Sequence, residues 1–171
     1  MTVNTHPETE IVADDTVPAI RITREFDAPP GKVFRAHTDP DLYARWVGPH
    51  DLATMVDTWD CRTGGSWAFH QTRGDETFAF YGSFHEVRPD ELIVQTFTFA
   101  GFPDGVALER LVLEDLGGGR TRLVATSLVD SFEARDAMLI SGMQTGVREG
   151  YQALDDLLTA EEGQAPTGPH R

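Results

Sequence analysis

The sequence predicts a single α+β domain in which one long C-terminal helix closes a curved antiparallel sheet. Most of the chain between residues 19 and 129 alternates apolar and polar residues, as strands do. Two short helical segments interrupt this run near its start. Residues 133–160 instead carry apolar residues at steps of three and four, the pattern of an amphipathic helix. The apolar positions of this helix are Ile140, Met143, Val147, Tyr151, Leu154 and Leu158.

Proline residues and the alternation of apolar and polar residues define the first three expected elements. A strand is expected over residues 19–27, and it places Ile20, Ile22, Arg24 and Phe26 on one face. Pro29-Pro30 ends this strand and begins a short helix, because proline fits the first helical turn. A second short helix is expected from Pro40 to Trp46, with Asp39 as its N-cap.

Six more strands follow, each bounded by turn residues such as Gly64-Gly65, Pro89-Asp90 and Gly117-Gly118-Gly119. The expected strands are residues 52–61, 66–72, 77–87, 92–99, 107–115 and 121–129. Short turns between consecutive strands indicate antiparallel pairing. The order of one strand, two short helices, six strands and a long helix fits the helix-grip architecture, in which a sheet wraps around a C-terminal helix.

Composition limits the class of protein. We expect one domain over residues 18–160, between a disordered acidic tail at 1–17 and a flexible tail at 161–171. The net charge of −14, from 28 acidic and 14 basic residues, argues against nucleic acid and against stable membrane association. With Cys61 as the one cysteine, no intrachain disulfide can form. No secretory signal or membrane span is recognisable, so a cytoplasmic protein is expected.

Several segments resemble one family. Phe26-Asp27-Ala28-Pro29-Pro30 with Arg45-Trp46-Val47-Gly48-Pro49 resembles the opening of START-like (SRPBCC) domains. The run Asp60-Cys61-Arg62-Thr63-Gly64-Gly65-Ser66-Trp67 is similar to the Asp-Leu-Arg-x-Gly-Gly-x-Trp turn of the branch named after the activator of the heat-shock-protein ATPase (AHSA-type). Residues 82–89 and 141–158 resemble its next strand and closing helix. The resemblance covers about residues 19–160 and implies a START-like helix-grip fold with a deep cavity.

The superfamily includes lipid carriers, hormone receptors and polyketide cyclases, so the resemblance leaves the activity open. Two departures bear on the cavity. Trp46-Val47 stands where the family often has paired tryptophans, and Cys61 stands where it has leucine. Both changes can reshape the cavity.

Aromatic and methionine side chains are the expected apolar lining of that cavity, although simple core packing explains them equally well. They are Trp67, Phe69, Phe80, Phe84, Phe97, Phe99, Met138 and Met143. Glycines 142, 146 and 150 stack along the long helix. They allow either close backbone packing or open space for a ligand, and in the second case Gly146 lines the ligand site.

Arg24 and Glu109 are predicted to point inward, because each shares a strand face with apolar residues. A structural ion pair, or a local twist that turns one of them outward, is one explanation. The other is that they orient a polar group of the ligand. In an enzyme, Glu109 is the candidate catalytic acid or base, if burial raises its pKa.

Other chemistry is not supported. His70 and His85 are expected on the outer face and His50 in a loop, and Cys61 is expected to be a packed strand residue. Gly117-Gly118-Gly119-Arg120-Thr121 lacks the ending of a phosphate-binding loop, and no metal motif is present. We therefore expect no metal and no cofactor.

Three functions remain. The first is binding of a small hydrophobic or amphipathic molecule between the sheet and the long helix. The second is a cyclase-like or hydrolase-like enzyme that uses the same cavity. The third is a protein-interaction module like the chaperone-ATPase activator. A homodimer is compatible with all three, and nothing in the sequence specifies its interface.

Overall fold

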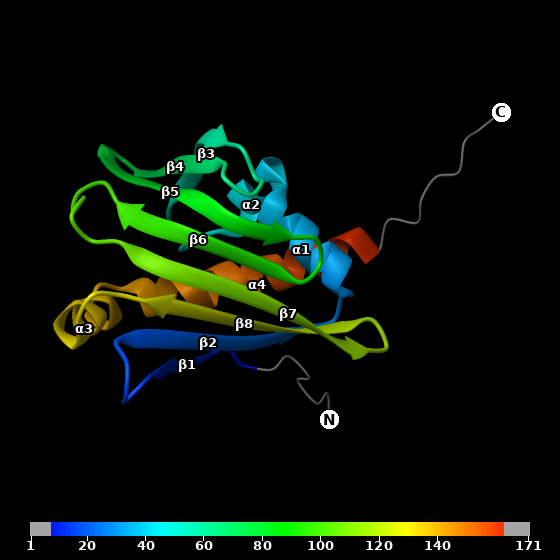
Figure 1. Ribbon diagram of the computed structural model, residues 1–171. Coiled ribbons are helices and arrows are strands. Elements are labelled where there is room, and N and C mark those ends of the chain that lie inside the picture. Colours follow the sequence, from blue (N-terminus) through cyan, green and yellow to red (C-terminus); the bar gives the residue numbers. More distant parts are fainter. Residues whose placement is uncertain (1–7, 163–171) are drawn as a thin grey trace, which may run out of the picture.

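The computed structural model describes residues 8–162. It forms one eight-stranded antiparallel sheet in the order β1-β2-β8-β7-β6-β5-β4-β3 (Figure 1). The strands are β1 Glu10–Ala13, β2 Ala19–Phe26, β3 Ala53–Trp59, β4 Ser66–Arg73, β5 Glu76–Arg88, β6 Leu92–Phe99, β7 Ala107–Gly117 and β8 Arg120–Leu128. The helices are α1 Pro30–Thr38, α2 Pro40–Trp46, α3 Phe132–Ile140 and α4 Met143–Glu162. The predicted α+β helix-grip fold is confirmed.

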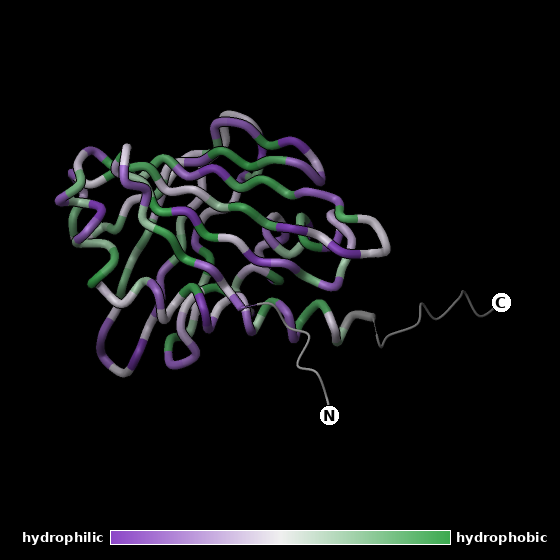
Figure 2. Tube along the Cα trace, turned by 90° about the horizontal axis from the view of Figure 1, so that it is seen from below, coloured by the Kyte–Doolittle hydropathy of each residue, from purple (hydrophilic) through white to green (hydrophobic). Residues whose placement is uncertain are grey.

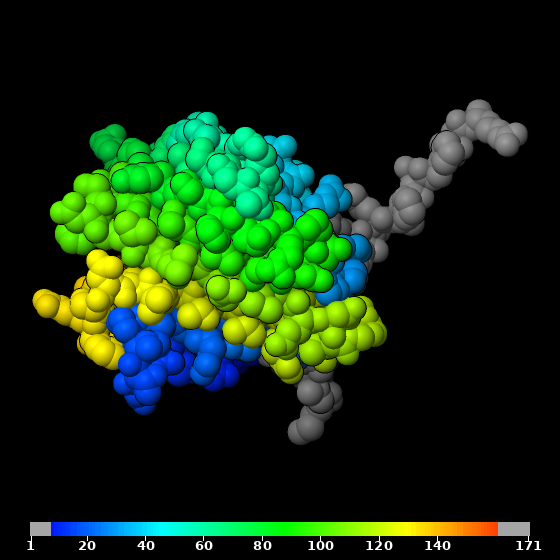
Figure 3. Space-filling view, in the orientation of Figure 1, coloured from blue at the N-terminus to red at the C-terminus, as the bar shows by residue number. Residues whose placement is uncertain are grey.

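Helix α4 lies along one face of the sheet, which we call the inner face (Figure 1). Seen from below, hydrophobic and hydrophilic residues alternate along the strands (Figure 2). In a space-filling view the side chains of the opposite, outer face hide α4 (Figure 3). None of the helices in residues 8–162 is long and apolar enough to cross a membrane.

The two short helices have the predicted ends. Pro30 opens α1, and the Asp39 carboxylate caps α2 by accepting from the amides of Asp41 at 2.9 Å and Leu42 at 3.3 Å. Two indoles, one buried and one partly buried, anchor these helices by hydrogen bonds. Trp46 Nε1 donates to the Ala36 carbonyl at 2.8 Å, and Trp59 Nε1 of β3 donates to the Thr38 carbonyl at 2.7 Å.

The prediction of one continuous helix over residues 133–160 is wrong. Gly142 has φ of +91°, in the left-handed region that interrupts a right-handed helix, and α3 ends before it at Ile140. Ser131 caps α3 by accepting from the Ala134 amide at 3.1 Å. At the break, Ile140 is 87% exposed, so it does not belong to the buried stripe that the sequence pattern suggested.

The prediction that residues 1–17 form a disordered tail is also wrong for the part that the structure describes. Strand β1 pairs antiparallel with β2, and Thr9 is buried beside it. Three arginines hold this segment in place. Arg24 donates to the Thr9 hydroxyl, Arg148 to the Thr9 carbonyl and Arg135 to the Asp14 carbonyl. These contacts join residues that are far apart in the sequence. The polar composition of the segment alone therefore predicted disorder. Residues 1–7 lie outside the described range.

At the other end, α4 continues to Glu162, two residues beyond the predicted end of the domain, and residues 163–171 lie outside the described range. The core has two parts. One lies between α4, α1 and the strands β2, β7 and β8, and the other lies around β4, β5 and β6. Phe34 of α1 and Tyr43 of α2 pack against both parts. The short helices therefore join the two halves of the inner face.

Candidate functional site

Three polar side chains form a row across the middle of the inner face. Gln95 of β6 lies opposite Glu109 of β7, and Glu109 lies opposite Ser127 of β8. Neighbouring strands are about 4.8 Å apart, so the row extends about 10 Å across the sheet. We call Gln95, Glu109 and Ser127 the polar row. The inward orientation predicted for Glu109 is confirmed by this register.

Glu109 is partly buried, and this burial raises the pKa of its carboxyl from 4.5 to about 7. Two phenols lie close to it, Tyr43 from α2 and Tyr151 from α4. Burial raises the pKa of both phenols, and the negative charge of Glu109 raises it further. The carboxyl therefore lies between the sheet and two helices, and it exchanges its proton near neutral pH.

The oxygens of Glu109, Tyr43 and Tyr151 make no hydrogen bond to any residue in the described range. In that range, the fully enclosed side-chain atoms without a partner are Arg24 Nε and Trp67 Nε1. The three oxygens are not in this group, so each of them adjoins space that water can reach. A carboxyl and two phenols, each with an oxygen open to solvent, therefore lie close together on the inner side of the sheet.

Aromatic rings surround this position. The ring centroid of Trp46 lies 5.3 Å from that of Tyr43 and 5.9 Å from that of Tyr151. Tyr43 also contacts Phe69 at 5.7 Å, and Tyr151 contacts Phe26 at 5.8 Å. The two tyrosines near Glu109 thus belong to a cluster of aromatic rings.

Arg24 also points inward, as predicted, but it has structural partners. Its guanidinium lies 3.5 Å from the Asp155 carboxylate of α4 and donates to the Thr9 hydroxyl at 3.2 Å. It also lies over the Phe26 ring, 5.2 Å from the centroid. The structural ion-pair explanation therefore holds for Arg24, with Asp155 rather than Glu109 as its partner.

The predicted lining residues divide into three groups. Trp67, Phe69 and Phe84 are fully buried and form a packed core. Phe80 and Phe97 are partly buried and contact each other, with ring centroids 5.4 Å apart. Phe99 is 40% exposed at the end of β6, and Met138 of α3 and Met143 of α4 are partly buried against the core. The partly buried residues of the inner face remain candidates for ligand contact.

The open-space explanation fails at Gly146 and Gly150, and Gly142 is exposed to solvent at the break between α3 and α4. A Cβ atom at Gly146 would lie 3.4 Å from Pro49 Cδ, and one at Gly150 would lie 3.1 Å from the Trp46 carbonyl oxygen. Gly150 therefore packs closely against the end of α2 and the residues after it, whereas Gly146 leaves room for an ordinary van der Waals contact with Pro49. Gly146 faces Pro49 rather than a ligand.

The remaining sequence candidates lie elsewhere. His85 is exposed on the outer face, His70 contacts Asp57 there with its Nδ1 2.7 Å from Asp57 Oδ2, and His50 contacts Glu149 in a loop. Cys61 lies in the turn after β3 rather than in a strand, and burial raises the pKa of its thiol to about 11. Within residues 8–162, no group of three acidic, histidine or cysteine side chains could hold a metal ion.

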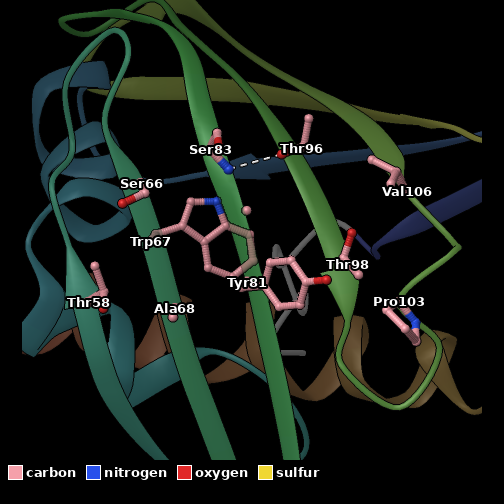
Figure 4. A pocket seen from close by; sticks show the side chains of 11 residues that line it. Thr58, Ser66, Trp67, Ala68, Tyr81, Ser83, Thr96, Thr98, Pro103 and Val106 are labelled. Carbon is pink, nitrogen blue, oxygen red and sulfur yellow. Dashed lines mark hydrogen bonds between the residues drawn. The ribbon is translucent and has the colours of Figure 1, made fainter.

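A separate pocket of about 550 Å³ opens over β3 to β6. Figure 4 shows hydroxyl-bearing side chains around it, with the Ser83 amide donating to Thr96 Oγ1 at 2.9 Å. Most of these residues alternate with the inward aromatic residues, so the pocket lies on the outer face. The inward Trp67 also lines it, because its indole packs against Gly82, which has no side chain. The pocket is lined by Thr58, Ser66, Trp67, Ala68, Tyr81, Gly82, Ser83, Thr96, Thr98, Pro103 and Val106. It holds no charged group, and it is distinct from the space beside Glu109.

The sheet, the two short helices and α4 define a protein of the START-like helix-grip class. Residues 27–159 match the family described as Activator of Hsp90 ATPase homolog 1-like protein, and the chain belongs to this family. A search of the curated proteins found no match.

Solved bacterial structures share the fold. One from Arthrobacter aurescens is 26% identical with a TM-score of 0.82, over 95% of this chain and 98% of that one. One from Rhodobacter sphaeroides is also 26% identical with a TM-score of 0.79, over 88% and 98%. One from Mycobacterium smegmatis is 24% identical with a TM-score of 0.80, over 96% and 100%.

Sequence reasoning missed four residues of the site. Gln95 alternates with Ile93 and Phe97, and Ser127 follows Leu123 and Ala125 at the same spacing, so both could have been placed inward. The spacing of Tyr151 places it in the apolar stripe of the long helix, and its hydroxyl is the signal for a polar role. Tyr43 carries no such signal, because only tertiary packing brings α2 over the sheet.

Proposed function

We propose that the protein binds a small, mainly apolar molecule between the inner face of the sheet and α4, with Glu109 contacting its polar group. The observation that best supports this is the Glu109 carboxyl itself. It has no hydrogen-bond partner in the described range, is partly open to solvent and lies near two tyrosines of an aromatic cluster. Mostly apolar walls with a few convergent polar groups are typical of small-molecule sites.

The free-energy cost of burying a carboxyl favours a functional role for Glu109. A carboxyl held in an apolar interior lowers stability unless it is paired or hydrogen-bonded. The protein supplies partners for Arg24, its other inward charge, which contacts Asp155 and Thr9. Glu109 lacks an equivalent arrangement, and a bound ligand would supply it.

The test is native mass spectrometry of the protein purified gently from its own host. We expect a reproducible extra mass that is lost on denaturation. Ala125→Phe should reduce this mass, because Ala125 is an inner-face residue of β8 beside the polar row. Thr126→Phe, the next residue on the outer face, is the matched control. An apo spectrum at all protein concentrations, with no compound from a host extract retained, would refute the proposal.

A second candidate function is catalysis, and it is favoured by the pKa of about 7 at Glu109. A carboxyl with such a pKa can act as a general acid or base at neutral pH. Incubation of the protein with the retained compound distinguishes the two. An enzyme converts the compound and loses turnover in Glu109→Gln, whereas a carrier returns it unchanged.

A further inference from the structure

The charges of the inner face do not balance. Arg24 and Glu109 are the charged side chains that the strand register places on this face away from the strand ends. Arg24 is neutralised by Asp155 of α4, with 3.5 Å between Nη2 and Oδ2. This leaves Glu109 as an acid without a cation in the described part of the interior.

Each polar group near Glu109 offers at least one hydrogen-bond acceptor, although the Gln95 amide and the three hydroxyls can also donate. The Glu109 carboxyl, the Gln95 amide oxygen and the Ser127 hydroxyl lie along the polar row, and the phenol oxygens of Tyr43 and Tyr151 lie on the helix side. An ammonium group carries three N–H donors and no acceptor. The ionised Glu109 carboxylate, which only accepts, can therefore pair with it, and the nearby hydroxyl and amide oxygens can accept its remaining hydrogens. Aromatic rings such as those of Tyr43, Trp46 and Tyr151 also attract cations.

From this geometry we infer that the ligand of the interior site is an organic amine, whose cationic nitrogen binds at Glu109 while its apolar body packs against the aromatic walls. The inference rests on the proposed function and names the ligand class. A carboxylate ligand would meet an acid with no free cation, since Arg24 is held by Asp155 and Thr9. The net charge of −14 also favours the approach of cations over anions.

Binding of an amine should depend on pH in a defined way. The ionisable groups with an electrostatic effect at this site are Glu109 itself, Tyr43 of α2, Tyr151 of α4 and Arg24 of β2, which acts on Tyr151. Both phenols stay neutral across the neutral range, because their pKa values are raised. Glu109 therefore sets the profile. Amine affinity should rise as Glu109 loses its proton around pH 7 and fall again when the amine is deprotonated near pH 10.

The experiment uses three probes of similar shape, phenethylamine, phenethyl alcohol and phenylpropionate, titrated into the full chain by calorimetry or NMR. We expect the amine to bind at least about tenfold more tightly than the alcohol at pH 8, and the acid to bind most weakly. Glu109→Gln should remove this preference while alcohol binding persists. Glu91→Gln removes the same charge from an exposed turn and is the matched control.

The outcomes separate the inference from the proposed function. If the alcohol or the acid binds as tightly as the amine, the site exists but the amine assignment is wrong. If an amine preference survives in Glu109→Gln, the amine binds elsewhere and the assignment is also wrong. If none of the three probes binds and the native spectra are also empty, the proposed function itself fails.

Discussion

Arg24 and Glu109 arise from the same sequence pattern but occupy different environments. Each is a charged residue among apolar neighbours on one face of a strand. Arg24 is 5% exposed, and its surroundings provide a carboxylate, a hydroxyl and an aromatic ring. Glu109 has only an electrostatic relation to two phenols, and it adjoins accessible space.

The difference shows how an inward charge can be interpreted. A charge whose partners are all within the protein contributes to the fold, and its removal leaves another charge buried. A charge that the protein leaves unsatisfied lowers stability, and such costs are typical of functional sites. The two residues should therefore respond in opposite directions to neutralisation.

The largest effect is expected from Arg24→Met. The Asp155 carboxylate would lose the guanidinium while it remains buried, so the free energy of unfolding should fall by about 3 to 5 kcal/mol. Urea unfolding measures this change. Arg21→Met, an exposed position on the same strand, is the control and should change stability by less than about 0.5 kcal/mol. A small loss in Arg24→Met would mean that Arg24, like Glu109, is not required by the fold.

The second effect should have the opposite sign. The pKa of Glu109 is raised, so the folded protein binds a proton that the unfolded chain has lost between pH 4.5 and about 7. Stability therefore falls as pH rises through this window. Glu109→Gln should remove that loss and be more stable than the wild type by about 2 to 3 kcal/mol at pH 8, with little difference at pH 4. Thermal unfolding across this pH range tests it. Equal stability at pH 8 would show that Glu109 is already satisfied within the protein.

The smallest changes in stability are expected from glycine substitutions in α4, the helix that carries both Tyr151 and Asp155. Gly150→Ala would place a Cβ 3.1 Å from the Trp46 carbonyl and 3.2 Å from the Gly48 amide nitrogen, so α4 must shift, at a cost of about 1 to 2 kcal/mol. Gly146→Ala makes only an ordinary contact with Pro49 and should stabilise the helix by up to about 1 kcal/mol. Chemical denaturation measures both. Similar changes in stability for Gly146→Ala and Gly150→Ala would contradict the expected difference between the two positions.

Local patterns predicted most of the architecture. Alternation placed Arg24 and Glu109 inward, proline and Asp39 marked the helix starts, and glycine pairs marked the turns. The failures came where distant contacts outweigh local preference. Strand β1 forms because three arginines and the edge of β2 hold a polar segment. The closing helix breaks at Gly142 although its apolar periodicity continues through the break.

By itself, the sequence determined the α+β class, the order of nearly all the elements and the inner face of each strand, because these follow from periodicity, capping and turn chemistry within a few residues. Only the tertiary structure decided which inward charge has a partner. Asp155 reaches Arg24 across 131 positions of the chain, and Tyr43 and Tyr151 meet beside Glu109 because α2 and α4 pack on one sheet. Such partners depend on how elements pack in space, which no local pattern records.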